Sequence, residues 1–310
     1  MTAAAIDLGT NTFHLIIAEL HGKNIEVVYK TSVSAQLGEG GLTDNIIQPK
    51  AFERGLLALE GFAEVLRSHQ VDVMKATATS AVRNASNCAD FVQAVQARTG
   101  IDIEVISGEQ EAEYIFKGVQ STGMIQGTSL VMDIGGGSTE FILCNEDRLI
   151  WKKSYDLGAA RLLQAFFKSD PLSLSDKQNI INHVHSNLAD LLEICKQHQP
   201  QTLIGSAGAF ESFATMLMIR KGEEVRPLSS APLDTQAYQE LADTIMQSTH
   251  AERAEMPGLI PLRVDMIVIA TLLVNFILDN TGICNLSLST NDLKMGVLQT
   301  LGDKHAGKSV

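Results

Sequence analysis

Two stretches of this chain show the same arrangement of apolar and polar positions. In residues 3–18, apolar runs on both sides enclose a turn of glycine and polar residues at 7–12. In residues 129–143, apolar runs enclose a similar turn at 133–140. Each pattern predicts two strands joined by a tight turn, because glycine and small polar residues tolerate the backbone angles that such turns need. The recurrence of the turn predicts a duplicated domain.

Apolar side chains at three- and four-residue spacing predict helices in the rest of the chain. Residues 49–68 are the clearest case, because Pro49 suits a first helical position and five apolar residues share one face: Leu56, Leu59, Phe62, Ala63 and Leu66. Further helices are expected at residues 87–98, 109–119, 175–198, 210–219, 235–248 and 264–279, and from residue 291 onward. Further strands are expected at residues 25–33, 71–78, 103–106, 149–155, 202–204 and 285–289. Strands followed by interleaved helices indicate an α/β chain.

Length and charge limit the function classes. The chain has 310 residues, of which 45% are hydrophobic, so it can bury two cores. Glycines at positions 118, 123 and 127 predict a hinge between two domains. The 36 acidic residues outnumber the 24 Lys and Arg residues, and a net charge of −12 argues against a nucleic-acid partner. A polyanionic ligand would therefore need a local cationic lining or a bound metal.

The sequence predicts neither export nor a membrane span. Asp7 interrupts the apolar core that a signal peptide needs, and the most apolar stretch, residues 266–278, contains Asn275 and is too short to cross a bilayer. Four cysteines without metal or redox spacing are interpreted as free thiols: Cys88, Cys144, Cys195 and Cys284. We therefore expect a cytoplasmic protein.

Both turns contain residues suited to binding phosphate. Glycines leave backbone N–H groups accessible to an anion, and hydroxyl side chains add donors. The candidate phosphate-binding residues are Gly9, Thr10, Asn11 and Thr12 in the first turn and Gly135, Gly136, Gly137, Ser138 and Thr139 in the second. Asp7 and Asp133 each follow a predicted strand and suit Mg²⁺ held directly or through water. Alternatively, each carboxylate accepts N–H bonds within its own turn.

Two segments between the turns carry a resemblance to a known family. Residues 79–87, Thr-Ser-Ala-Val-Arg-Asn-Ala-Ser-Asn, and residues 106–112, Ile-Ser-Gly-Glu-Gln-Glu-Ala, resemble the signature segments of the exopolyphosphatase and guanosine pentaphosphate (pppGpp) phosphohydrolase family. The resemblance extends to residues 7–15, 133–140, 157–162 and 257–259, and to Arg263 and Asp265. It covers nearly the whole chain and corresponds to the short two-domain form of the family.

The resemblance implies a fold and an activity. The fold is a pair of duplicated RNase H-like domains of the actin-like ATPase superfamily with an interdomain cleft, with domain I at 1–120 plus 296–310 and domain II at 121–295. The activity is magnesium-dependent removal of the terminal phosphate of inorganic polyphosphate or of pppGpp. Members of that family often form dimers, so a homodimer is left open, although the sequence shows no interface pattern.

The resemblance also implies roles for particular residues. Glu111 matches the general base that activates water, and Arg83 matches an arginine at the phosphate site. Asp133 and Glu140 match acidic residues tied to metal and water, and Arg263 is a candidate phosphate contact. Phosphoryl transfer depends mainly on positioning and charge stabilisation. The smallest expected set of catalytic groups is therefore one carboxylate that orients water and one guanidinium that neutralises the leaving charge.

Alternatives remain open beside these roles. Glu111 could be an exposed helix residue, and Arg83 could cap a helix or pair with a surface acid. The chain also departs from the family at three places, with His14 in place of Arg, Gln110 in place of Glu and an altered phrase at 292–296. Two other functions are therefore considered, an alarmone-sensing or nucleotide-sensing binding protein with little turnover and a filament-forming actin-like ATPase.

Further positions carry weaker expectations. The turn at residues 205–209 stands where actin-like proteins receive a nucleoside, and the bulky residues after it, Phe210 and Phe213, either fill that pocket or belong to a simple strand-to-helix turn. Arg161 is a second candidate contact for an anionic ligand. Three other cations are expected on a solvated surface: Arg220, Lys221 and Arg253.

Overall fold

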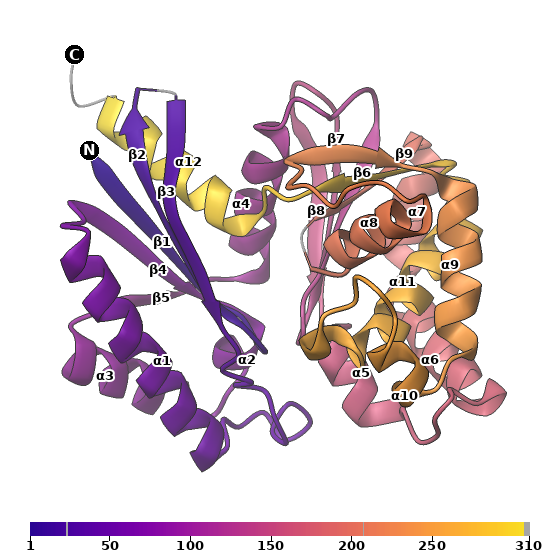
Figure 1. The fold of residues 1–310 in the computed structure, drawn as a ribbon, viewed down its shortest axis with the longest axis horizontal. Coiled ribbons are helices and arrows are strands. Elements are labelled where there is room, and N and C mark those ends of the chain that lie inside the picture. The colour runs from indigo at the N-terminus through magenta and orange to yellow at the C-terminus, as the bar shows by residue number, and fades with distance from the viewer. Residues whose placement is uncertain (23, 207, 307–310) are drawn as a thin grey trace. The chain divides into compact units, whose positions relative to one another are not determined.

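The computed structural model describes residues 1–22, 24–206 and 208–306, and the chain divides into two compact units (Figure 1). Unit 1 consists of Met1–Gly118 and Asp292–Val310, and unit 2 consists of Val119–Asn291. The predicted turn residue Ala207 and the predicted carboxyl-terminal residues 307–310 lie outside the described residues.

Unit 1 contains a five-stranded sheet in the order β3-β2-β1-β4-β5. Figure 1 shows α1 and α3 on one side of this sheet and α12 on the other. Residues Ala3–Ile6 of β1 are fully buried, as expected for a central strand covered on both faces. The elements of unit 1 are β1 (Thr2–Leu8), β2 (Phe13–His21), β3 (Asn24–Val33), α1 (Pro49–Ser68), β4 (Val73–Ala78), α2 (Ser80–Arg83), α3 (Cys88–Thr99), β5 (Ile103–Val105), α4 (Gly108–Gln120), whose last two residues belong to unit 2, and α12 (Leu293–Ala306).

Unit 2 contains a six-stranded sheet in the order β10-β11-β9-β6-β7-β8. Its core is centred on α11 (Met266–Thr281), which is apolar all round and is surrounded by other elements of this unit. The remaining elements are β6 (Ser129–Ile134), β7 (Thr139–Cys144), β8 (Leu149–Tyr155), α5 (Ala159–Phe166), α6 (Leu174–Asn187), α7 (Ala189–His198), β9 (Thr202–Ser206), α8 (Gly208–Arg220), β10 (Ser230–Leu233), α9 (Thr235–Gln247), α10 (His250–Ala254), the short 3₁₀ helix η1 (Pro261–Arg263) and β11 (Asn285–Ser289).

The two sheets repeat one topology. In each, an antiparallel meander of three strands (β1-β2-β3 and β6-β7-β8) is extended by two strands parallel to its first member (β4-β5 and β9-β11). Each glycine turn joins the first two strands of its meander, at β1–β2 and at β6–β7. The predicted α/β fold with duplicated RNase H-like units is therefore confirmed.

One predicted helix was wrong. Residues 175–198 form two helices, α6 and α7, which are separated at the fully buried Leu188. The side chains of Ser186 and Asn187 both donate to the carbonyl of His183, at 2.9 and 2.8 Å. Such local side-chain bonds compete with regular helix hydrogen bonding, so the first helix ends there.

Unit 1 brings α4 and α12 together at two glycines. A Cβ atom on Gly118 would lie 2.2 Å from the carbonyl oxygen of Asp292, and one on Gly296 would lie 1.8 Å from the carbonyl oxygen of Tyr114. No side chain fits at these distances. The phrase 292–296 departs from the family pattern but keeps the glycine that this close approach requires.

We predict that Gly296→Ala destabilises the protein, because the added methyl group would force α12 away from α4. Overpacking of this kind costs about 1–3 kcal/mol of unfolding free energy. Gly61→Ala is the matched control, since Gly61 lies inside α1 with no atom near its Cβ position. That change should stabilise the helix by about 0.5–1 kcal/mol. Urea unfolding followed by circular dichroism measures both, and equal midpoints for the two variants would contradict the packing argument.

Candidate functional site

The first glycine turn is tied to the loop that follows β3. The N–H of Gly9 donates to the carbonyl of Thr12 at 3.2 Å, and a Cβ on Gly9 would meet that same oxygen at 2.8 Å. The carbonyls of Thr10 and Asn11 accept N–H bonds from Gly38 and Gln36, at 3.0 and 2.8 Å. The backbone of the first glycine turn is therefore fixed by one hydrogen bond within the turn and by two from the loop that follows β3.

Asp7 lies on β1 just before this turn. In the sheet register it stands opposite His14 on β2 and beside Thr77 on β4. His14, where the family commonly has Arg, is thus a direct cross-strand neighbour of the candidate metal ligand.

Glu111 and Arg83 form an ion pair within unit 1. Nη1 of Arg83 donates to Oε2 of Glu111 at 2.9 Å and to the carbonyl of Ile106 at 3.1 Å. Glu111 is only 7% exposed, so the alternative of an exposed helix residue is wrong.

The ends of adjacent parallel strands bring this pair together. Thr79 follows β4, and both its N–H and its hydroxyl donate to the carbonyl of Leu8, at 3.3 Å each. The N–H of Ile106, after β5, donates to the carbonyl of Ala78 at 3.1 Å. The segments that carry Arg83 and Glu111 are therefore anchored at the carboxyl-terminal edge of the sheet, beside the first glycine turn.

Gln110 caps the helix that carries Glu111. The N–H of Gln110 donates to the hydroxyl of Ser107, and the N–H of Ser107 donates to Oε1 of Gln110, both at 3.2 Å. This is a reciprocal capping box, in which Gln and Glu serve equally. Gln110, which stands where the family commonly has Glu, therefore still fixes the start of α4.

The second glycine turn is held by the first turn of α5. The N–H groups of Ala159 and Ala160 donate to the carbonyls of Gly135 and Gly136, each at 2.9 Å. A Cβ on Gly158 would lie 2.4 Å from the backbone of the turn, so only glycine permits this contact. In addition, Nε of Arg161 donates to the carbonyl of Gly137 at 3.0 Å.

These contacts occupy the carbonyl groups of the second turn rather than its N–H groups. Within the described parts of the chain, the N–H groups of Gly136 and Gly137 have no protein acceptor. The hydroxyl of Thr139 is used internally, because it donates to the carbonyl of Leu157 at 2.9 Å. Ser138 is 3% exposed.

Asp133 and Glu140 are direct cross-strand partners on β6 and β7. Directly paired residues of an antiparallel sheet project from the same face, so the two carboxyl groups are neighbours. Glu140 is buried and accepts the hydroxyl of Ser154 at 2.6 Å. Among the residues that the structure describes, no cluster of three or more His, Cys, Asp or Glu side chains is arranged as a metal site. Two carboxylates nevertheless fit Mg²⁺, which keeps several waters and binds substrate phosphates as well.

Arg263, on η1, contacts the first turn of α8. Its Nη1 donates to the hydroxyl of Ser212 at 2.9 Å, and its Nη2 pairs with Oε2 of Glu211 at 3.1 Å. Phe210 and Phe213 on the same helix are fully buried, and a Cβ on Gly205 would collide with the Phe210 ring. The two phenylalanines therefore belong to the core of unit 2.

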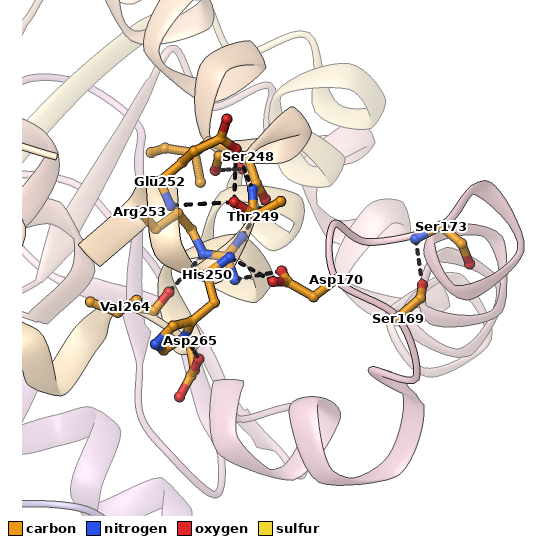
Figure 2. A network of polar contacts seen from close by, with 11 residues as sticks. Ser169, Asp170, Ser173, Ser248, Thr249, His250, Glu252, Arg253, Val264 and Asp265 are labelled. Carbon is orange, nitrogen blue, oxygen red and sulfur yellow. Dashed lines mark hydrogen bonds and ion pairs between the residues drawn. The ribbon is translucent and has the colours of Figure 1, made fainter. Parts of the chain in front are cut away.

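Arg253 forms a network of polar contacts with Ser248, Val264 and Asp170 (Figure 2), and Val264 directly follows Arg263 in the sequence. Arg253 is 1% exposed, so the expectation of a solvated side chain was wrong. Its guanidinium donates to the carbonyl of Ser248, to the carbonyl of Val264 at 2.9 Å and to Asp170 at 3.0 Å. Burial acts to raise the pKa of Asp170, but bonds from the His250 N–H and from Arg253 outweigh it, so that the pKa lies below its usual value.

We predict that Arg253→Gln destabilises the protein by about 3 kcal/mol, because the carbonyls of Ser248 and Val264 lose a buried charged donor. Arg220→Gln is the control, since Arg220 is exposed and makes one hydrogen bond to Thr244. It should change the free energy of unfolding by less than about 0.5 kcal/mol. Thermal unfolding of both variants is the measurement, and a small loss for Arg253→Gln would show that the network is dispensable.

The sequence reasoning missed several of these residues. The pattern Thr249-x-x-Glu252 is a capping box and could have predicted α10 before the structure was known. The burial of Arg253 and the pairing of Glu211 with Arg263 had no local signal, because each depends on segments that meet only in the fold.

The four cysteines are free thiols. Burial raises the pKa of Cys144 to about 12 and that of Cys195 to about 11, so both remain protonated at neutral pH. Neither is suited to be a nucleophile. Within the described residues, no helix has the length and apolarity needed to cross a bilayer.

The repeated meanders with their glycine turns define a protein of the actin-like ATPase fold. A family model described as the Ppx/GppA phosphatase family matches residues 16–305, and the chain belongs to this family.

Relatives of known structure or description agree with this assignment. The crystal structure of an exopolyphosphatase from Cytophaga hutchinsonii is 35% identical, covers 98% of each chain and superposes with a TM-score of 0.95. A bifunctional 3-dehydroquinate synthase/phosphatase of Fusobacterium nucleatum is 32% identical over 95% of this chain and 46% of that protein. A guanosine-5'-triphosphate,3'-diphosphate pyrophosphatase of Vibrio vulnificus is 31% identical over 83% of this chain and 50% of that protein. The chain thus spans about half the length of these curated relatives.

Proposed function

We propose that this chain is a magnesium-dependent phosphohydrolase that removes the terminal phosphate of inorganic polyphosphate, of pppGpp, or of both. The ion pair of the buried Glu111 with the half-buried Arg83 is the observation that carries this proposal. It lies beside a glycine turn in a chain of the Ppx/GppA phosphatase family. The relatives named as an exopolyphosphatase and as a guanosine-5'-triphosphate,3'-diphosphate pyrophosphatase support the two substrate classes.

In this proposal Glu111 is the general base. Its carboxylate takes a proton from a water molecule, the water oxygen bonds to the terminal phosphorus, and the bond from that phosphorus to the bridging oxygen breaks. Arg83 holds the carboxylate in place. A guanidinium has five N–H donors, so the bonds from Nη1 leave others for a phosphate oxygen.

The glycine turns bind phosphate oxygens in the same proposal. In unit 2 the N–H groups of Gly136 and Gly137 are suited donors, and Asp133 with Glu140 would hold Mg²⁺. A bound Mg²⁺ supplies positive charge that neutralises the phosphate oxygens. In unit 1 the turn at Gly9–Thr12 has the matching role, with Asp7 as a further candidate ligand. A cytoplasmic location accords with the four free thiols.

We predict that Glu111→Gln lowers phosphate release by about 10²–10⁴-fold, the usual contribution of a general base. Glu109→Gln is the matched control, because Glu109 is an exposed residue in the same helical turn. Phosphate release is measured from long-chain polyphosphate, tripolyphosphate, pppGpp and ATP side by side. Unchanged turnover in a folded Glu111→Gln protein would refute the assignment of the base. Calorimetry that detects tight pppGpp binding by the wild type without phosphate release would instead favour a sensing protein.

We predict that chelation of divalent cations abolishes phosphate release and that added Mg²⁺ restores it. Asp133→Asn should raise the Mg²⁺ concentration for half-maximal activity by at least about tenfold, the lower end of the loss expected for groups that support a metal. Asp147→Asn is the control, because Asp147 is exposed in the loop after β7 and loses the same charge. Activity that persists in a chelator would contradict the metal requirement.

A further inference from the structure

The first turn of α8 contains a charged contact that the proposed mechanism leaves unexplained. Arg263, the candidate phosphate contact, is paired with Glu211 and hydrogen-bonded to Ser212. The side chains of Arg263 and Glu211 are 23% and 40% exposed, so water and solutes reach the pair. A guanidinium at such a place binds carboxylate and phosphate with the same fork of donors.

This contact lies close to the second glycine turn within unit 2. In the sheet register Ser206, the last residue of β9, stands beside Asp133 of β6. A Cβ on Gly208, the first residue of α8, would lie 3.8 Å from the carbonyl oxygen of Ile134, which precedes the glycines. Glu211 and Ser212 follow Gly208 by about one helical turn, or about 5.4 Å. A chain of phosphates bound at the glycine turn would therefore extend past the start of α8, where Glu211 meets Arg263.

A buried hydroxyl marks the same end of the sheet as a polar site. Ser206 is 1% exposed, and its Oγ has no hydrogen-bond partner in the parts of the chain that the structure describes. Buried polar atoms without partners are rare in native proteins because each costs free energy. A polar ligand at the end of β9 would supply the missing partner.

We propose that Glu211 is an internal competitor for Arg263 and thereby determines which anions bind. Without ligand, its carboxylate neutralises the guanidinium. An incoming polyphosphate segment displaces the carboxylate and takes its place on Nη2, while Ser212 continues to orient Nη1. Anions with little charge do not displace Glu211, whereas a polyphosphate chain does, because several of its phosphates bind at once. This inference rests on the proposed function, since it assigns the same ligand class to Arg263.

The competition predicts tighter binding when the competitor is neutralised. In Glu211→Gln, the dissociation constant for long-chain inorganic polyphosphate should fall about two- to fivefold at low salt, the range of a partly exposed ion pair. High salt should reduce this gain through screening. Glu240→Gln removes the same charge from an exposed position on α9 and should leave the constant unchanged. Isothermal calorimetry in a chelator, without turnover, is the measurement.

A second variant tests whether the effect passes through Arg263. Arg263→Gln should weaken binding, and adding Glu211→Gln to it should bring no further gain. If Glu211 only supported the fold, Glu211→Gln would weaken polyphosphate binding. If Glu211 competes for Arg263, the same change strengthens binding, so the direction of the change in affinity separates the two roles. Equal or weaker binding by Glu211→Gln, a gain that persists without Arg263, or no polyphosphate binding by the wild type would each overturn the inference.

The same measurements keep this inference separate from the proposed function. If the wild type binds polyphosphate but releases no phosphate from any substrate, the hydrolase proposal fails and the competition result still stands. If the wild type hydrolyses polyphosphate but Glu211→Gln gains no affinity, only the inference fails.

Discussion

The burial of the Glu111 carboxylate is the constraint on which the arrangement of unit 1 depends. An ionised carboxylate loses much hydration when it is removed from water, so it needs a charged partner and fixed hydrogen bonds. Arg83 supplies the partner, and the capping box of Ser107 and Gln110 fixes the start of the helix that carries Glu111. The glycines at positions 118 and 296 then let α12 lie against that helix without an intervening side chain. The ion pair and the helix cap thus act directly on the position of one carboxylate, and the two glycines bring α12 against the helix that carries it.

The two units use one topology but hold their turns differently. In unit 1, the loop after β3 donates N–H groups to the carbonyls of the turn. In unit 2, the first turn of α5 donates N–H groups to the corresponding carbonyls. Both arrangements occupy carbonyl oxygens from outside the turn. In unit 2 this leaves the N–H groups of Gly136 and Gly137 without a protein acceptor among the described residues, and N–H groups are what an anion requires.

Elements with long regular patterns could be predicted from the sequence, whereas contacts between distant segments could not. The helix at Pro49–Ser68 and the strand at Leu149–Tyr155 have the predicted bounds, because apolar spacing and turn residues define them locally. The four-residue helix α2 is too short for such a pattern.

The candidate site shows the same limit. Motifs identified Glu111 and Arg83 as residues of interest, but their ion pair depends on the ends of β4 and β5 lying side by side. Likewise, only the fold shows that Arg253 is buried and that Glu211 forms an ion pair with Arg263.

The net charge of the protein explains why the pairing of arginines with glutamates matters for anion binding. With a net charge of −12, the protein as a whole repels a polyanion, so affinity must come from groups at short range. Two of the arginines implicated in phosphate contact are already paired with glutamates, Arg83 with Glu111 and Arg263 with Glu211. In the proposed function, neutral backbone N–H groups carry a large share of the recognition, since they attract anions without being cancelled by a carboxylate. Under the proposed function, the glycine turn of unit 2 and Arg263 favour ligands that present many phosphate oxygens in a row, because several phosphates are needed to bind the N–H groups and displace Glu211 at the same time.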